Sequence, residues 1–181
     1  MSEMTPHKNQ TKVTLEDLGY RTELEDYRKE QQLDSFGVGR VIKQHKDRYS
    51  VSTTSSELEC ELTGNLRFTA ESETELPAVG DWVAISEYDT GKGLIHVVLP
   101  RSSMLERKAV GKKGQSQVIA TNIDVGLIIQ SINRDFSVNR LERYMTICNN
   151  ANIEPVIVLS KIDLLEADEL EKTLTLTSPR L

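Results

Sequence analysis

The feature that most constrains the fold is an apolar run late in the sequence, E-P-V-I-V-L-S-K-I-D-L at residues 154–164. Its β-branched stretch, Val156 to Leu159, has the continuous hydrophobic character of a strand buried on both faces of a parallel sheet. Open sheets of this kind bind ligands just beyond the carboxyl ends of their strands. The polar residues expected at that position are Ser160, Lys161 and Asp163.

A lysine and an aspartate two residues apart at a strand end suit the recognition of guanine. The carboxylate of Asp163 can accept hydrogen bonds from guanine N1–H and N2–H₂, and the stem of Lys161 can lie along the face of the base. The tetrapeptide resembles the Asn-Lys-x-Asp guanine-specificity motif of GTPases, with Ser160 at the Asn position. A hydroxyl makes fewer hydrogen bonds than an amide, which weakens the match at residue 160 but not at residue 163. The alternative interpretation is a strand followed by an ordinary polar turn.

A second apolar strand, V-G-L-I-I-Q-S-I, precedes this run at residues 125–132. Between the two strands, apolar side chains recur at the spacing of one helical face: Leu141, Tyr144, Met145 and Cys148. Strand, helix and strand form a βαβ unit with parallel strands and a right-handed crossover. A further helix is expected over residues 165–174. Residues 118–181 are therefore predicted to be an incomplete α/β segment, because two strands are too few to bury their own faces.

The preceding region, residues 35–100, has a different character. Five short, mostly alternating runs are separated by Gly, Asp, Asn or Pro. This spacing predicts a small five-stranded β-barrel, with an oligonucleotide/oligosaccharide-binding (OB-like) barrel as the first choice and an SH3-like barrel as the alternative. The runs are F-G-V-G-R-V-I-K-Q, R-Y-S-V-S-T, L-E-C-E-L, G-D-W-V-A-I and G-L-I-H-V-V-L.

Trp82 lies in the middle of one predicted strand and has two interpretations. It could be a platform on which a base stacks. Core filling is the preferred interpretation, because apolar residues flank it on the same run. Three other aromatic residues are candidates for base stacking: Phe36, Tyr49 and Phe68.

The charge of the chain excludes a globally basic nucleic-acid binder, since 22 Lys and Arg stand against 28 Asp and Glu. One segment departs from this balance, R-S-S-M-L-E-R-K-A-V-G-K-K-G-Q-S-Q at residues 101–117. A flexible basic loop of this kind can bind RNA by displacing counterions from the phosphate backbone. The alternative is a solvated linker between domains. The candidate RNA-binding residues are Arg101, Arg107, Lys108, Lys112 and Lys113.

The remaining sequence features indicate setting and organisation. Residues 1–12 are polar and expected to be disordered, and residues 13–34 are expected to hold one or two short helices, with Thr14 as N-cap and Asp17 three residues on. Two distant cysteines without a signal peptide predict a reducing, cytoplasmic setting. No apolar run approaches the roughly 20 residues of a membrane span, and the three histidines have no metal-ligand spacing. The predicted divisions are 1–34, 35–100, 101–117 and 118–181.

The order of these parts carries a family resemblance. An ordinary GTPase domain places its phosphate loop first and its guanine motif late, whereas here the guanine motif follows a β-barrel directly. This order resembles the circularly permuted GTPases, specifically the ribosome small subunit-dependent GTPase A family, over nearly all of residues 35–165. The phrases that carry the resemblance are V-G-D-W-V-A-I, V-L-P-R-S-S, A-T-N-I-D and V-I-V-L-S-K-I-D-L.

The resemblance implies a function beyond what the residues alone indicate. Members of the family hydrolyse GTP, with Mg²⁺, when the small ribosomal subunit stimulates them, and they act late in maturation of that subunit. Their barrel and a C-terminal zinc-binding module contact ribosomal RNA. The implied partners are the small subunit and its rRNA, without a membrane, and the protein is expected to be a monomer.

Part of the machinery that the resemblance implies is missing from the sequence. No segment matches the phosphate loop G-x-x-x-x-G-K-[S/T], since Gly111-Lys112-Lys113 lacks the earlier glycine and the hydroxyl residue. Asp34 to Gly37 spells D-x-x-G but precedes the barrel, so we interpret it as coincidence, and there is no Cys/His zinc cluster. The expectation is a truncated, N-terminal portion of a GTPase that cannot hydrolyse GTP by itself. The alternative function is a non-enzymatic rRNA-binding module.

Overall fold

The computed structural model describes residues 13–108, 116–132, 136–164, 171–172 and 175. It divides into two compact units, Met1–Pro100 and Arg101–Leu181, and each is described by itself. The tail expected to be disordered, residues 1–12, and most of the helix expected over residues 165–174 lie outside the described residues. No helix in the described ranges is long and apolar enough to cross a membrane.

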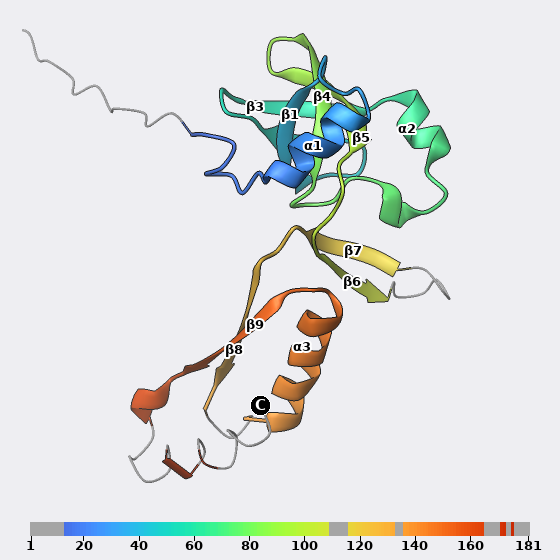
Figure 1. The fold of residues 1–181 in the computed structure, drawn as a ribbon. Coiled ribbons are helices and arrows are strands. Elements are labelled where there is room, and N and C mark those ends of the chain that lie inside the picture. The colour runs from blue at the N-terminus through green and yellow to red at the C-terminus, as the bar shows by residue number, and fades with distance from the viewer. Residues whose placement is uncertain (1–12, 109–115, 133–135, 165–170, 173–174, 176–181) are drawn as a thin grey trace, which may run out of the picture. The chain divides into compact units, whose positions relative to one another are not determined.

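The first unit contains a closed five-stranded barrel (Figure 1). The strands close in the order β1-β2-β3-β5-β4, and β3 pairs with β5 in parallel while the other pairs are antiparallel. This is the strand order of an OB-like barrel, which confirms the predicted fold and sets the SH3-like alternative aside. The five predicted strands all form: β1 (Gly37–Gln44), β2 (Tyr49–Ser52), β3 (Glu57–Leu62), β4 (Trp82–Asp89) and β5 (Lys92–Val98).

The barrel interior is filled by the apolar residues that alternate along its strands. Each is at most 4% exposed, which is the signature of a complete core. Strands β1 and β2 approach closely at Gly39, where an added Cβ would lie 2.3 Å from Val51 Cγ1. The interior residues are Val41, Tyr49, Val51, Leu58, Cys60, Val83, Ile85 and Ile95.

A second apolar cluster lies between the barrel and the N-terminal segment. Helix α1 (Thr22–Glu30) contributes Leu24, and the barrel contributes Trp82, which is 1% exposed. The ring of Tyr20 meets Trp82 edge-on, with centroids 4.9 Å apart. Trp82 is therefore a core residue, as preferred from the sequence. Thr14 and Asp17 do bond reciprocally, at 2.9 and 3.1 Å, but they close a turn that precedes α1.

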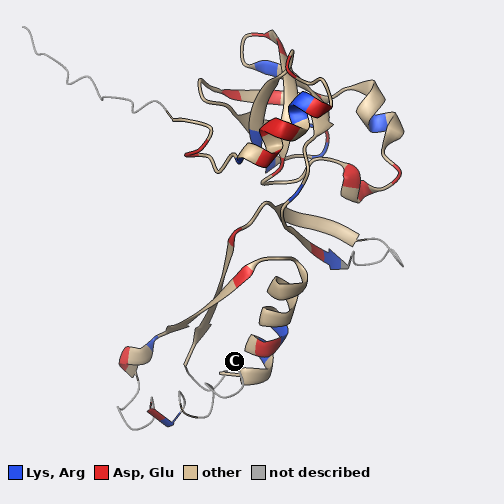
Figure 2. Ribbon diagram, in the orientation of Figure 1, with Lys and Arg blue, Asp and Glu red and all other residues tan. Residues whose placement is uncertain are grey.

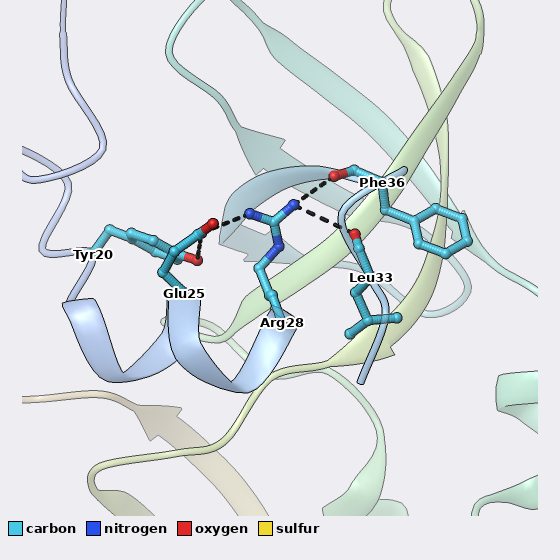
Figure 3. A network of polar contacts seen from close by, with 5 residues as sticks. All are labelled: Tyr20, Glu25, Arg28, Leu33 and Phe36. Carbon is cyan, nitrogen blue, oxygen red and sulfur yellow. Dashed lines mark hydrogen bonds and ion pairs between the residues drawn. The ribbon is translucent and has the colours of Figure 1, made fainter. Parts of the chain in front are cut away.

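A partly buried arginine, Arg28, hydrogen-bonds to the turn between α1 and β1 (Figure 3). Arg28 Nη1 donates to Glu25 Oε2 at 2.8 Å, and Nη2 donates to the carbonyls of Phe36 at 2.7 Å and Leu33 at 3.4 Å. The Tyr20 hydroxyl donates to the same Glu25 oxygen at 3.0 Å. Hydrogen bonding by Tyr20 and Arg28 lowers the pKa of Glu25, although partial burial opposes that shift. The network keeps the carboxylate ionised beside the guanidinium and joins the N-terminal segment to the barrel.

Between β3 and β4 the structure differs from the sequence expectation. The segment between the third and fourth predicted strands, expected only to separate them, contains a short helix, α2 (Gly64–Thr69). Thr63 caps this helix, since its Oγ1 accepts from the Leu66 N–H at 3.3 Å. A 3₁₀ turn, η1 (Glu73–Glu75), follows. Phe68, on α2, is 91% exposed and remains a candidate stacking residue.

The two other aromatic candidates are engaged within the barrel unit. Tyr49 lies in the barrel interior and is 4% exposed, so it cannot stack on a base. Phe36 is half-buried and packs against the ring of His96, with centroids 4.3 Å apart.

The second unit combines a hairpin with a βαβ motif. Strands β6 (Met104–Lys108) and β7 (Ser116–Thr121) pair antiparallel. They are followed by β8 (Val125–Ser131), α3 (Val138–Asn150) and β9 (Glu154–Ser160). Strands β8 and β9 are parallel, with Val125 opposite Glu154 and Ser131 opposite Ser160. The predicted βαβ unit is confirmed. The expected loop over 101–117 instead includes β6 and the start of β7, because the backbones of these two segments pair as antiparallel strands.

Helix α3 covers one face of the β8–β9 pair. Leu141 is fully buried, and an added Cβ at Gly126 would lie 3.0 Å from Cys148 Sγ. Two expectations of burial are wrong: Tyr144 is 42% exposed, and Val156 is 37% exposed although its run predicted burial on both faces. The physical reason is that, within the described residues, this sheet has two strands and a helix on one side only.

Candidate guanine site and basic hairpin

The guanine motif lies at the carboxyl end of β9, as the sequence predicts. Strand β9 ends at Ser160, and a single 3₁₀ turn, η2 (Ile162–Leu164), follows Lys161. The backbone of Ile132, which follows β8, donates to the Ser160 carbonyl at 3.1 Å. Because β8 and β9 are parallel, both strands end at the same edge of the sheet, where α/β folds bind their ligands.

The backbone at Lys161 has an unusual conformation. Its φ of +59° lies in the left-handed region, which costs a residue other than glycine on the order of 1 kcal/mol. The Leu164 N–H donates to the Lys161 carbonyl at 3.2 Å and closes the turn.

The side chains of Lys161 and Asp163 are exposed. Within the part of the chain that the structure describes, neither makes a hydrogen bond or an ion pair, so the carboxylate oxygens of Asp163 are available to accept from a ligand. Two acceptor oxygens match the N1–H and N2–H₂ edge of guanine. This match is the chemical basis of the candidate guanine site.

Potential metal-ligating side chains are not clustered in the described residues. Among them, no group of three or more His, Cys, Asp or Glu side chains could hold a metal ion.

The structure separates the predicted RNA-binding residues. Arg107 is exposed on β6, where Nε and Nη2 donate to Gln117 Oε1 across the hairpin at 3.2 and 3.0 Å. Lys108 ends the strand beside it, whereas Arg101 precedes β6 and donates to Met104 Sδ at 3.2 Å. About six residues of extended chain, roughly 20 Å, separate Arg101 from Arg107. Lys112 and Lys113 lie outside the described residues.

The surface of β3 is acidic, unlike a surface that binds a phosphate backbone. Glu57, Glu59 and Glu61 alternate on its exposed side, and Figure 2 shows acidic residues on α1 and η1 as well. Arg48 pairs with Glu59 and lies 3.6 Å from Glu61, which raises the pKa of its guanidinium. OB folds generally bind nucleic acids through strands 2–3 and the adjoining loops. The acidic β3 face therefore favours the hairpin over this face as the RNA-binding element.

Comparison with solved structures defines the class of protein. A circularly permuted GTPase, YloQ, matches with a TM-score of 0.61 and 22% identity, over 80% of this chain and 47% of that one. YjeQ from Thermotoga maritima matches with a TM-score of 0.60 and 24% identity, over 78% and 47%. The chain therefore shares its fold with part of a circularly permuted GTPase.

Sequence comparison identifies the family within that class. The RsgA GTPase family model matches residues 98–178. The small ribosomal subunit biogenesis GTPase RsgA 2 of Lactiplantibacillus plantarum is 46% identical over 127 residues, and RsgA 1 of Bacteroides thetaiotaomicron is 40% identical over 126. The alignments cover 70% of this chain and 36% and 35% of those proteins. The chain matches the RsgA GTPase family, and it spans little more than a third of the length of these curated relatives.

Two features were missed from the sequence. The hairpin was missed because Gly, Ser and Lys in residues 111–116 suggested a loop, although the alternation in M-L-E-R-K and S-Q-V-I-A-T was a signal for two strands. The left-handed turns at Asn122 and Asn152 were also missed, with φ of +52° and +59°. Their signal was the asparagine itself, which adopts this conformation more readily than most residues.

Proposed function

We propose that this chain provides the guanine-recognition strand and the RNA-contacting elements of a small ribosomal subunit biogenesis GTPase. The observation that carries the proposal is the Ser160-Lys161-Ile162-Asp163 turn at the carboxyl end of β9, next to the end of β8. Asp163 accepts the guanine N1–H and N2–H₂, and the stem of Lys161 covers one face of the base. GTP, with Mg²⁺, is the nucleotide of the whole protein, and the small subunit with its rRNA is the partner.

Base recognition alone gives weak binding. Each charge-assisted hydrogen bond to a phosphate contributes roughly 1.5–3 kcal/mol, and a phosphate loop supplies several. We therefore expect residues 1–181 to show no GTP hydrolysis and at best very weak GDP binding. Tight, magnesium-dependent GDP binding measured by calorimetry on this chain would contradict the proposal.

The base-reading role of Asp163 is tested by exchanging guanine for xanthine. In Asp163→Asn the new NH₂ group opposes the N2 amino group of guanine but pairs with the carbonyl that xanthine has there. A site built on such hydrogen bonds rejects a mismatched partner strongly. In a chain extended to the length of the relatives, Asp163→Asn should lose GTP affinity and gain XTP affinity in competition binding. The same preference should appear with guanosine and xanthosine in NMR titrations of residues 1–181.

Lys161→Ala is the matched control, because the lysine contacts the ring face and not its edge. It should weaken the binding of both nucleotides without changing which of the two binds more tightly. If Asp163→Asn keeps the guanine preference, the turn at 160–163 is an ordinary strand end.

The RNA-binding role of the hairpin is tested separately. Lys112→Glu with Lys113→Glu should weaken binding to small-subunit rRNA and reduce the slope of log K against log salt by about one for each phosphate that is no longer neutralised. Lys43→Glu with Lys46→Glu, in the barrel unit, carries the same charge change. Equal effects of the two pairs would show a general charge effect. No effect of the Lys112 and Lys113 pair would mean that residues 101–117 are only a linker.

The alternative function is an rRNA-binding module without nucleotide chemistry. It predicts that Lys112→Glu with Lys113→Glu weakens rRNA binding, while Asp163→Asn changes no nucleotide preference. The two functions are therefore distinguished by the same set of variants.

A further inference from the structure

Three polar residues from separate loops bond to one another in the second unit: Ser102, Asn122 and Asn152, here called the Asn–Ser clamp. The Ser102 N–H and hydroxyl donate to Asn122 Oδ1 at 2.9 and 3.2 Å. The Ser102 carbonyl accepts from Asn152 Nδ2 at 2.9 Å. Ser102 precedes β6, Asn122 follows β7, and Asn152 lies in the turn between α3 and β9. The clamp therefore joins the base of the hairpin to the end of the βαβ unit where β9 begins.

Other hydrogen bonds beside the clamp also connect the segments that precede β6, β8 and β9. Ser103, only 5% exposed, bonds through its hydroxyl to both the N–H and the carbonyl of Ile123, at 2.6 and 2.8 Å. The Met104 N–H donates to the Ala151 carbonyl at 3.3 Å, and the Glu154 N–H donates to the Asp124 carbonyl at 3.0 Å. The start of β6 and the start of β9 are thus held by one continuous set of hydrogen bonds.

Both asparagines have left-handed backbones, with φ of +52° at Asn122 and +59° at Asn152. Asparagine is one of the few residues that enter this region readily while offering an amide to a neighbour. The two side chains do opposite things, since Asn122 accepts from Ser102 and Asn152 donates to it. Because one asparagine accepts and the other donates, the same substitution should affect them differently if the side-chain hydrogen bonds matter. It should affect them equally if only the left-handed backbone matters.

We propose that the Asn–Ser clamp joins the β6–β7 hairpin and the βαβ unit into one mechanical body. A displacement of the hairpin is then transmitted to the α3–β9 turn and to β9. The guanine motif lies at the other end of β9. The RNA part of this inference, that RNA bound at the hairpin stabilises β9, rests on the proposed function. The mechanical part does not.

The mechanical part is tested by amide hydrogen exchange on Asn→Asp variants. Aspartate keeps the acceptor oxygens and tolerates the left-handed conformation but loses the NH₂ donor. Asn152→Asp should therefore break the clamp, and the amides of Met104 and Glu154 should exchange about tenfold faster, as expected for loss of one hydrogen bond. Asn122→Asp keeps the bonds from Ser102 and should have a clearly smaller effect.

Two further variants complete the design. Asn152→Gly keeps the left-handed turn without any side chain and should match Asn152→Asp. Asn65→Asp makes the same chemical change at an exposed position of the first unit and should leave these amides unchanged. Unchanged exchange in Asn152→Asp, or equal effects of aspartate at 122 and 152, would overturn the clamp.

The RNA part is tested with a ten-nucleotide oligouridylate. In the unchanged chain its binding should slow exchange in β9, whereas Asn152→Asp should bind it with the same affinity and show no slowing in β9. Slowing in both chains would overturn the coupling. If the unchanged chain does not bind the RNA, the RNA part falls together with the proposed RNA contact, and the mechanical part is decided by the exchange experiment without RNA.

Discussion

The barrel and the βαβ unit bury similar β-branched and aliphatic side chains to very different extents. In the barrel, Ile95 and Val51 are both 0% exposed, because strands surround them on every side. On β8 and β9, alternate residues face α3, and the others face away from it. Leu127 and Ile129 are 62% and 65% exposed on that outer face. Similar apolar side chains therefore form a complete core in one unit and cover only one face of the strands in the other.

The comparison shows what a closed sheet provides that an open pair of strands lacks. A barrel has no edge strands, so each strand is paired on both sides and its inward face is covered by the opposite wall. The β8–β9 pair has a covering helix on one face only, within the described residues. Stability should accordingly depend on position more than on residue type, and the following predictions test this from the largest effect to the smallest.

The largest effect should come from truncating the same residue type in the two units. Ile95→Ala removes a fully buried side chain from the barrel and should cost about 2–5 kcal/mol. Ile129→Ala removes a side chain that is mostly exposed and should cost less than about 0.5 kcal/mol. Hydrogen exchange of the amides in each unit measures both. Comparable losses would mean that another surface covers the outer face of β8.

Adding a methyl group should also separate the units. In Gly39→Ala the new Cβ would meet Val51 Cγ1 at 2.3 Å and the Ser52 carbonyl at 3.0 Å, so the barrel must deform, at a cost of about 1–3 kcal/mol. In Gly126→Ala it would meet Cys148 Sγ at 3.0 Å, where α3 can yield, and the cost should be about 1 kcal/mol or less. Urea unfolding followed by Trp82 fluorescence reports the first variant, and exchange of β8 amides reports the second. A larger cost at Gly126 would show that the βαβ unit is the tighter one.

The reactivity of the two cysteines should also differ between the barrel and the βαβ unit. Burial raises the pKa of Cys60 to about 11, and the side chain is 0% exposed in the barrel interior. Cys148, on α3, is only half-buried. Because the thiolate is the reactive form, iodoacetamide at pH 8 should modify Cys148 well before Cys60. Mass spectrometry of the digested protein measures the order, and urea should abolish the difference. Equal rates without urea would show that the barrel opens as often as the second unit.

The smallest effect should be a pH dependence confined to the barrel. Burial lowers the pKa of His96 below its ordinary value of 6.5, and its Nε2 lies 2.7 Å from Ser86 Oγ. Folding therefore favours the neutral ring, and the stability that depends on it is lost as pH falls through 6.5 toward the lower folded value. The melting temperature followed by Trp82 fluorescence should fall slightly between pH 7.5 and 5.5, and less in His96→Gln. An identical fall in the variant would assign the effect to other groups.

The sequence by itself determined the elements whose signals are local. Five alternating runs became the five strands of the barrel, and V-G-L-I-I-Q-S-I with E-P-V-I-V-L-S became the parallel pair β8 and β9. The position of Lys161 and Asp163 at a strand end also followed from the sequence, because an apolar run must end where its polar residues begin. The order along the chain, barrel before guanine motif, together with the four phrases quoted above, led to the recognition of the family.

Only the tertiary structure decided how far each element is buried and which distant residues meet. A continuous apolar run predicts burial on both faces of a strand but cannot show what covers each face, and Val156, expected to be buried, is 37% exposed. Likewise Ser102, Asn122 and Asn152 are separated by 20 and 30 positions, and their hydrogen bonds depend on loop conformations that no local pattern specifies. Local periodicity indicates which segments form strands and helices. Burial and side-chain hydrogen bonds depend on which other parts of the chain pack against those segments.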